Sequence, residues 1–247
     1  MGRPDHVRDE PDGAGPLGPV LDGWPGRWRV HHVEQTGSTN ADLVEAAAGG
    51  APDRTVLVTD HQTAGRGRLD RRWEAPPGHN LLVSILIRDD VPPDPSELTR
   101  RVGLAAVEAA RSVGTETGLK WPNDVLVGDD KLAGILAQRC DDGSVVVGLG
   151  LNVRWAPAGA ASLGGSAQPM QVLRAVLDAY DALPTDIDHA YRAALLTLGR
   201  RVRVMLADGE IVGTATDMER DGRLVVIDDC ALTHRVSAGD VVHLRTA

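Results

Sequence analysis

The pattern of apolar residues changes at Gly199, and this change constrains the fold more than any other feature of the sequence. Beyond it, segments rich in Val, Ile and Thr recur at short, even intervals. These segments span residues 201–206, 210–217, 223–227, 231–236 and 240–245. Asp208-Gly209 and Asp221-Gly222, which lie between them, are dipeptides typical of hairpin turns. Short strands joined by tight turns predict a small β-barrel domain over residues 200–247.

The chain before Gly199 has the longer and more varied segments of an α/β domain, which we expect over residues 27–199. Strand patterns at 28–34, 55–60, 80–88 and, in short pieces, 118–152 alternate with helical patterns at 39–48, 94–113, 169–182 and 186–199. Residues 1–26 hold five prolines among many Gly and Asp residues and few apolar anchors. We therefore expect a flexible N-terminal tail over residues 1–26.

Charge and cysteine content disfavour several classes of protein. The 26 Lys and Arg residues against 35 Asp and Glu residues give a formal net charge of −9, and a general grip on duplex DNA needs clustered cations instead. Cys140 and Cys230 lie far apart, which argues against a disulfide framework or a structural zinc site. No apolar stretch approaches the roughly 20 residues that cross a bilayer. We expect a cytoplasmic protein with no membrane or DNA partner.

Residues 61–79, named the arginine loop, form a long segment without periodicity, and such segments inside a domain are usually functional or disordered. Between Gly65 and Trp73, four arginines stand beside one acidic residue, Asp70. The four are Arg66, Arg68, Arg71 and Arg72. Guanidinium groups match carboxylate and phosphate oxygens, and interleaved glycines let backbone N–H groups approach a ligand. The loop therefore suits a small anionic ligand; a solvated basic surface loop is the alternative.

A second polar cluster lies within a dozen residues of sequence. It consists of Lys120, Asn123, Asp124 and Lys131. Lys131 begins an apolar strand, so its ammonium is expected at the edge of a buried sheet, where it can stabilise charge on a phosphoryl or carboxyl oxygen. A strand-end lysine that serves solubility and a simple turn at Asn123-Asp124 are the alternatives.

Two shorter segments carry polar side chains that need partners. Ser38, Thr39 and Asn40 stand at the start of a predicted helix, where capping explains one of them but not all three. Asn152 interrupts an apolar strand, and a buried Asn is either part of a structural network or a ligand contact.

Five motifs occur in order along the chain and carry a family resemblance. They are Gly-Ser-Thr-Asn at 37–40, Gln62 with Gly65-Arg66-Gly67-Arg68 and Trp73, Lys-Trp-Pro-Asn-Asp at 120–124, Lys-Leu-Ala-Gly-Ile at 131–135, and Gly-Leu-Asn-Val at 150–153. This order resembles the bacterial biotin protein ligases, biotin–[acetyl-CoA-carboxylase] ligases, in the form that lacks an N-terminal DNA-binding domain. The resemblance implies an α/β (α+β) mixed-sheet catalytic domain of the biotin/lipoate ligase type, followed by an SH3-like β-barrel. Asp70 departs from the small residue that many relatives have there.

The resemblance also implies an ATP-dependent reaction in two steps. Biotin and ATP would give biotinyl-5′-AMP and pyrophosphate. Biotin would then pass to a lysine of the biotin carboxyl carrier domain of an acyl-CoA or pyruvate carboxylase. Mg²⁺ would accompany ATP, near Asp124, without a firm set of protein ligands.

Site roles are implied residue by residue. Lys131, Arg66 and Arg68 are the candidates for catalysis, because they would hold the carboxylate and the α-phosphate. The residues implied in biotin binding are Ser38, Thr39, Asn40, Gln62, Arg66, Gly67, Arg68 and Lys131. The residues implied in ATP binding are Arg68, Arg71, Arg72, Trp73, Lys120, Asn123, Asp124, Lys131 and Asn152.

Other functions stay open at this point. A lipoate ligase or octanoyltransferase would share the catalytic fold, although the arginine loop and the Lys-Trp-Pro-Asn-Asp segment favour biotin. A non-catalytic biotin-binding regulator is a second alternative, and retention of Lys131 and both loop arginines argues against it. A nucleic-acid-binding protein is disfavoured by the charge of −9. The oligomeric state is open, and a weak homodimer is compatible with the sequence.

Overall fold

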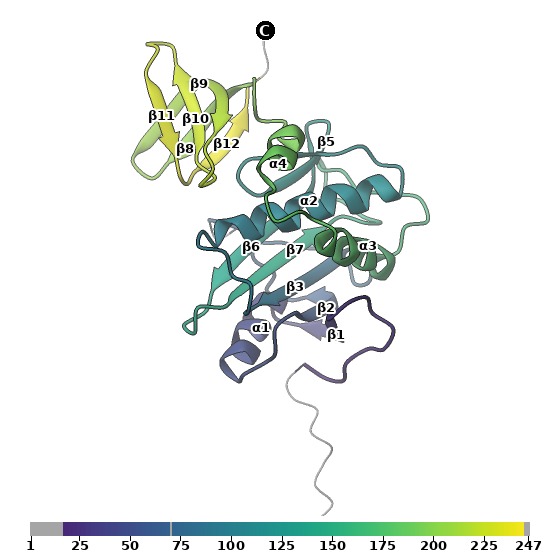
Figure 1. Cartoon of the computed structure of the whole chain (residues 1–247). Helices are drawn as coiled ribbons and strands as arrows, with labels where there is room; N and C mark the ends of the chain where they lie inside the picture. Colours follow the sequence, from purple (N-terminus) through teal and green to yellow (C-terminus); the bar gives the residue numbers. More distant parts are fainter. Residues whose placement is uncertain (1–16, 70, 245–247) are drawn as a thin grey trace, which may run out of the picture.

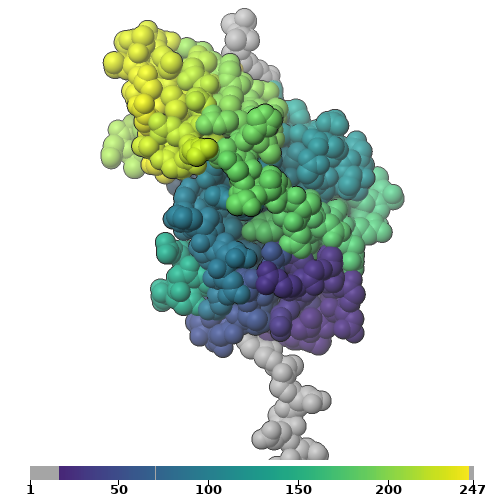
Figure 2. Space-filling model, in the orientation of Figure 1, coloured from purple at the N-terminus to yellow at the C-terminus, as the bar shows by residue number. Residues whose placement is uncertain are grey.

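The computed structural model describes residues 17–69 and 71–244. It contains an α/β part built on one large sheet and, at one end of it, a smaller sheet formed by the C-terminal strands (Figure 1). In the space-filling view the C-terminal strands lie against the α/β part (Figure 2). No helix of the described residues is long and apolar enough to span a membrane.

The large sheet has seven strands in the order β1-β2-β3-β7-β6-β5-β4. Their bounds are β1 Arg29–Thr36, β2 Thr55–Gln62, β3 Leu81–Ile87, β4 Gly118–Lys120, β5 Asp124–Val127, β6 Asp130–Arg139 and β7 Val145–Leu151. β1 and β2 run parallel because helix α1 (Thr39–Ala48) crosses between them, and the other neighbours are antiparallel. The predicted mixed sheet is therefore confirmed.

Helices lie on both faces of the sheet. Helices α2 (Ser96–Ser112), α3 (Pro169–Asp181) and α4 (Asp188–Ala194) contribute to the main core, whereas Leu43 and Ala47 of α1 pack on Leu57 and Leu86 from the opposite face (Figure 1). Every residue of β3 is buried, since the strand is covered on both sides. Helix α1 covers only part of this second face of the large sheet. Residues of the arginine loop lie over another part of the same face.

The C-terminal sheet has five antiparallel strands in the order β11-β10-β9-β8-β12. Their bounds are β8 Arg201–Leu206, β9 Gly209–Met218, β10 Leu224–Asp228, β11 Thr233–Val236 and β12 Asp240–His243. All five coincide with the predicted segments to within two residues at each end. Alternate residues such as Val202, Val204 and Val226 are buried, which is the period-two pattern of a sheet with one covered face. A domain limit between residues 199 and 200 stays a prediction.

The N-terminal prediction needs a correction. Residues 1–16 of the predicted tail lie outside the described residues, but residues 17–26 pack on the α/β part. Leu17 is buried, Val20 pairs with His31, and Trp24 lies under the Arg174 guanidinium, 4.8 Å from its ring centroid. The sequence prediction missed this because single apolar anchors among prolines and glycines give no periodic signal.

Candidate active site

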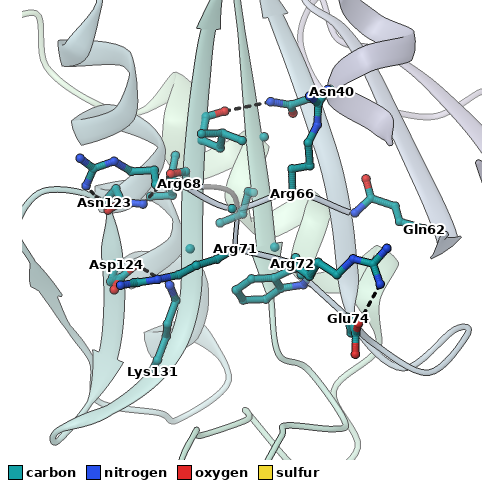
Figure 3. Close-up of a pocket in the computed structure, with 18 of the residues that line it drawn as sticks. Asn40, Gln62, Arg66, Arg68, Arg71, Arg72, Glu74, Asn123, Asp124 and Lys131 are labelled. Atoms are coloured by element: carbon teal, nitrogen blue, oxygen red, sulfur yellow. Dashed lines mark hydrogen bonds and ion pairs between the residues drawn. The ribbon is translucent and has the colours of Figure 1, made fainter. Parts of the chain in front are cut away.

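A cavity of about 240 Å³ lies on the α1 face of the large sheet, under the arginine loop. Its floor consists of the neighbouring strands β6 and β7, its polar end is the start of α1, and its charged end reaches the turn before β12. Figure 3 shows Asn40 at the polar end and Lys131 with Asp124 at the charged end. The floor is hollow because Gly134, Gly148 and Gly150 present no side chain there. Gly134 pairs with Gly150, and Gly148 pairs with Leu136.

Two of these glycines are required by close neighbours. A Cβ atom on Gly148 would lie 2.1 Å from Asn40 Oδ1, and one on Gly150 would lie 2.5 Å from the Trp73 ring. Asn40 and Trp73 therefore rest directly on the backbone of β7. The Gly-Leu-Gly-Leu sequence at 148–151 carried this signal, because glycine at period two clears one face of a strand.

The polar end of the cavity is a network of uncharged groups. The Thr39 backbone N–H donates to Gln62 Oε1 at 2.8 Å, and Asn40 Nδ2 donates to the Leu136 carbonyl at 3.0 Å. The hydroxyl of Ser84, on β3, lies 2.7 Å from Thr39 Oγ1 and 2.5 Å from Asn40 Oδ1. Ser84 was not predicted, although a lone Ser in an apolar strand is a signal for a buried polar contact.

Ser38 is at the N-cap position of α1, with φ −159° and ψ 122°, but its side chain makes no capping hydrogen bond. Simple capping therefore does not account for its hydroxyl. The residue is buried and lines the cavity, which leaves the hydroxyl available to a ligand.

The charged end pairs most cations with carboxylates. Lys131 Nζ lies 2.7 Å from Asp124 Oδ1 and 5.6 Å from the centroid of the Trp73 ring (Figure 3). Arg71 forms an ion pair with Asp240 of the C-terminal sheet. Hydrogen bonding to this carboxylate, and its charge, raise the pKa of Arg71 above the usual arginine value.

The remaining arginines differ in what they can offer a ligand. Arg72 pairs at 3.9 Å with Glu74, and both side chains are 77% exposed, so this pair lies at the rim. Arg68 donates to two neutral acceptors, Asn123 Oδ1 and the Gly239 carbonyl, each at 3.2 Å. Arg66 has no ion-pair partner among the described residues. Among the described residues of the arginine loop, Arg66 and Arg68 are therefore the two arginines that form no ion pair with a carboxylate.

Asn123 and Asn152, the two asparagines predicted on the ATP side, have structural partners as well as a place on the cavity wall. Asn123 Nδ2 donates to the Ile135 carbonyl at 2.8 Å. The buried Asn152 donates to the Ala161 carbonyl at 2.9 Å and accepts a hydrogen bond from Asn80 at 3.1 Å. The network alternative for Asn152 is thus observed, and its effect is to fasten the segment after β7 beside the cavity.

All but one of the predicted site residues line this cavity. The residues brought together are Ser38, Thr39, Asn40, Gln62, Arg66, Gly67, Arg68, Arg71, Arg72, Trp73, Asn123, Asp124, Lys131 and Asn152. Lys120 is the exception, because it ends β4 at the sheet edge and lines a separate cavity with Arg200 and His243. Its placement does not support the predicted ATP contact. Asp240 was missed, since nothing in its local sequence links it to residues of the arginine loop.

The folding stability of the chain is expected to depend on pH through His243, which lines the same cavity as Lys120. Burial, then Arg200 and Lys120, lower its pKa to about 4. Arg200 donates to His243 Nδ1 at 3.2 Å, so the imidazole is held neutral. The unfolded chain binds this proton near pH 6.5, so the free energy of unfolding falls as the pH drops from about 6.5 to 4. We expect His243→Gln to flatten this dependence in chemical denaturation curves; a slope equal to that of the unmodified chain would contradict it.

The described residues contain no group of three or more His, Cys, Asp or Glu side chains that could hold a metal ion. Asp124 and Asp240, the carboxylates deepest in the charged end, are each paired with a cation. Mg²⁺ usually binds through one or two carboxylates together with substrate phosphates. Asp124 and Asp240 therefore fit a magnesium ion that arrives with a polyphosphate.

Comparisons with known proteins identify the class that this fold and site define. Residues 33–152 match the model of the Biotin/lipoate A/B protein ligase family, and residues 197–244 match that of the Biotin protein ligase C terminal domain. A biotin--[acetyl-CoA-carboxylase] ligase of Mycobacterium tuberculosis is 42% identical over 97% of this chain and 94% of its own length. The chain belongs to the biotin protein ligase family.

Solved structures agree with this assignment. A biotin protein ligase from Aquifex aeolicus in complex with biotin and ATP has a TM-score of 0.75 at 26% identity, over 88% of this chain and 99% of that one. A Leishmania major biotin protein ligase in complex with biotinyl-5-AMP has a TM-score of 0.61 at 20% identity, over 85% and 98% of the two chains, and supports the fold alone. The predicted fold class, with its C-terminal β domain, is confirmed.

Proposed function

We propose that this chain joins biotin to a lysine of a biotin carboxyl carrier domain in two steps, through biotinyl-5′-AMP. The sequence prediction of an ATP-dependent biotin protein ligase is confirmed at the level of the enzyme class by the close relative and by the structural match to a ligase with biotin and ATP. The individual residue roles are proposals that rest on the geometry of the cavity, and the acceptor is a proposal that rests on the similarity to a biotin--[acetyl-CoA-carboxylase] ligase.

One observation carries the proposal: a single cavity joins an uncharged polar end to a cationic end across a glycine floor. Biotin has a neutral ureido ring and an anionic tail. The amide and hydroxyl groups of Asn40, Thr39 and Ser38 suit the ring, because neutral donors and acceptors fix an uncharged ligand in an otherwise apolar pocket. The tail then points toward Lys131.

The charged end of the cavity can reduce the electrostatic repulsion between the two substrates of the first step. A carboxylate and a triphosphate repel each other, so the site has to supply positive charge where both meet. The biotin carboxylate oxygen attacks the α-phosphorus, a P–O bond forms, and pyrophosphate leaves with the electron pair of the broken bond. Lys131 is held by Asp124 at the cavity wall, and Arg66 and Arg68 form no ion pair with any carboxylate of the described residues. Mg²⁺, when bound with ATP, would neutralise charge on the phosphates near Asp124.

The second step needs no nucleophile from this chain. The acceptor lysine attacks the carbonyl carbon of the mixed anhydride as a neutral amine, an amide bond forms, its proton passes to solvent, and AMP leaves. We propose that the acceptor belongs to an acyl-CoA or pyruvate carboxylase. The described residues of the arginine loop line the cavity, and a loop across the site would limit hydrolysis of the adenylate by water.

The proposal is tested with purified protein, ATP, MgCl₂, biotin and a carrier domain, with mass spectrometry of the carrier. A biotinyl adduct on the acceptor lysine that requires both ATP and biotin is the expected result. Replacement of biotin by lipoate separates the main alternative. A lipoyl adduct formed faster than the biotinyl adduct would assign the enzyme to lipoate, and ligand binding without any adduct would favour a non-catalytic regulator.

A further inference from the structure

The turn before β12 reaches from the C-terminal sheet into the active-site cavity. Among the lining residues of the described chain, Asp240 alone comes from that sheet. Its carboxylate pairs with Arg71, and the neighbouring Gly239 carbonyl accepts a hydrogen bond from Arg68 at 3.2 Å. Two arginines of one loop are thus held by two consecutive residues that lie about 170 positions further along the chain.

The position of this turn is fixed by packing. Asp240 pairs with Met205 and Val241 with Val204 on strand β8, and Val241 is fully buried. Gly239 has no room for a side chain, because a Cβ atom would lie 2.8 Å from Val204 Cγ1 and 3.0 Å from the Met205 carbonyl. The Asp240 carboxylate is therefore held at a defined point, and it is 25% exposed.

The partner side chain is more loosely held. Arg71 is 62% exposed, and an ion pair with so exposed a member contributes little to folding stability. Orientation is a different matter, since a long arginine side chain without a partner samples many rotamers. Arg68 has two acceptors. Its guanidinium donates to the Gly239 carbonyl of the C-terminal sheet and also to Asn123, which lies next to Asp124 of the Lys131–Asp124 pair.

We propose that Asp240 is a positioning residue for the ligase reaction, which orients Arg71 toward the nucleotide and, with the Gly239 carbonyl, holds the arginine loop across the cavity. The inference rests on the proposed function and deepens it. The C-terminal sheet thereby completes the site, because a guanidinium held in advance binds a phosphate without first losing its rotational freedom.

The experiment compares Asp240→Asn and Asp240→Ala with Asp229→Asn as a matched control. Asp229 is also an aspartate of the C-terminal sheet that pairs with an arginine, Arg201, but it lies outside the cavity. We expect both Asp240 variants to raise the KM for ATP and the release rate of bound biotinyl adenylate by about 3- to 10-fold, the lower range for charged hydrogen bonds. The melting temperature should stay unchanged, and Asp229→Asn should match the unmodified protein.

A double variant tests whether Asp240 acts through Arg71. In an Arg71→Ala background, Asp240→Ala should add no further change to the KM for ATP or to adenylate release. Equal behaviour of the Asp240 and Asp229 variants would overturn the proposal, and so would additive effects in the double variant. Absence of any adenylate with the unmodified protein would instead overturn the proposed function, so the two failures are distinguishable.

Discussion

Lys131→Ala is expected to reduce biotin-dependent exchange of pyrophosphate into ATP by about 100- to 1,000-fold, the usual cost of removing one preorganised group that stabilises developing charge. Exchange measures adenylate formation without the carrier domain. The ammonium lies at the boundary between the floor and the charged end, against Asp124 and over the Trp73 ring. No other side chain of the described residues places an ammonium in this cavity, because the chain has only one further lysine, Lys120, and it lines another cavity.

The controls separate lost chemistry from a disturbed site. Lys131→Ala leaves Asp124 unpaired, and its charge would repel the substrates; the double variant Lys131→Ala/Asp124→Ala removes that charge and should remain inactive. Arg111→Ala removes a cation on the exposed side of α2 and should retain exchange. Recovery of exchange in the double variant, or near-normal exchange in Lys131→Ala, would remove Lys131 from the proposed chemistry.

Gly148→Ala is expected to weaken biotin binding by at least tenfold. The new methyl group would lie 2.1 Å from Asn40 Oδ1, and Asn40 is held by the Leu136 carbonyl and by Ser84. Overpacking of a tight interior costs about 1–3 kcal/mol, so the polar end must rearrange. ATP binding at the other end should change little. Isothermal titration with biotin and with ATP, each alone, measures the two effects separately.

Two further variants make this result specific. Gly49→Ala is the control: Gly49 is the C-cap of α1, the helix that carries Asn40, and the nearest atom to a Cβ there is an ordinary 3.4 Å away, so this variant should bind biotin normally. Gly148→Ala alone should also lower the melting temperature, because the clash strains the folded state. In Gly148→Ala/Asn40→Ala the clash is absent, so the melting temperature should rise above that of Gly148→Ala while biotin binding stays weak. Tight biotin binding by that double variant would show that Asn40 is not part of the biotin site.

Most strands and helices of the fold were predicted from local pattern. The hydrophobic runs at 80–88 and 39–48 became β3 and α1, because strong periodicity and clear terminal residues decide local structure. The helical pattern at 186–199 was only partly correct, since α4 ends at Ala194 and the Leu196 backbone N–H then bonds to the Leu119 carbonyl of β4. A tertiary hydrogen bond outweighed helix propensity there.

The sequence by itself determined the order of the five motifs and the segments that form the two sheets, because each depends on residues close in sequence. Only the tertiary structure decided that Lys120 points away from the cavity while Asp240 enters it, that Ser84 supports the polar end, and that residues 17–26 pack on the domain. These facts depend on pairs far apart in the chain. Their proximity is set by sheet pairing and packing and is not written in any local pattern.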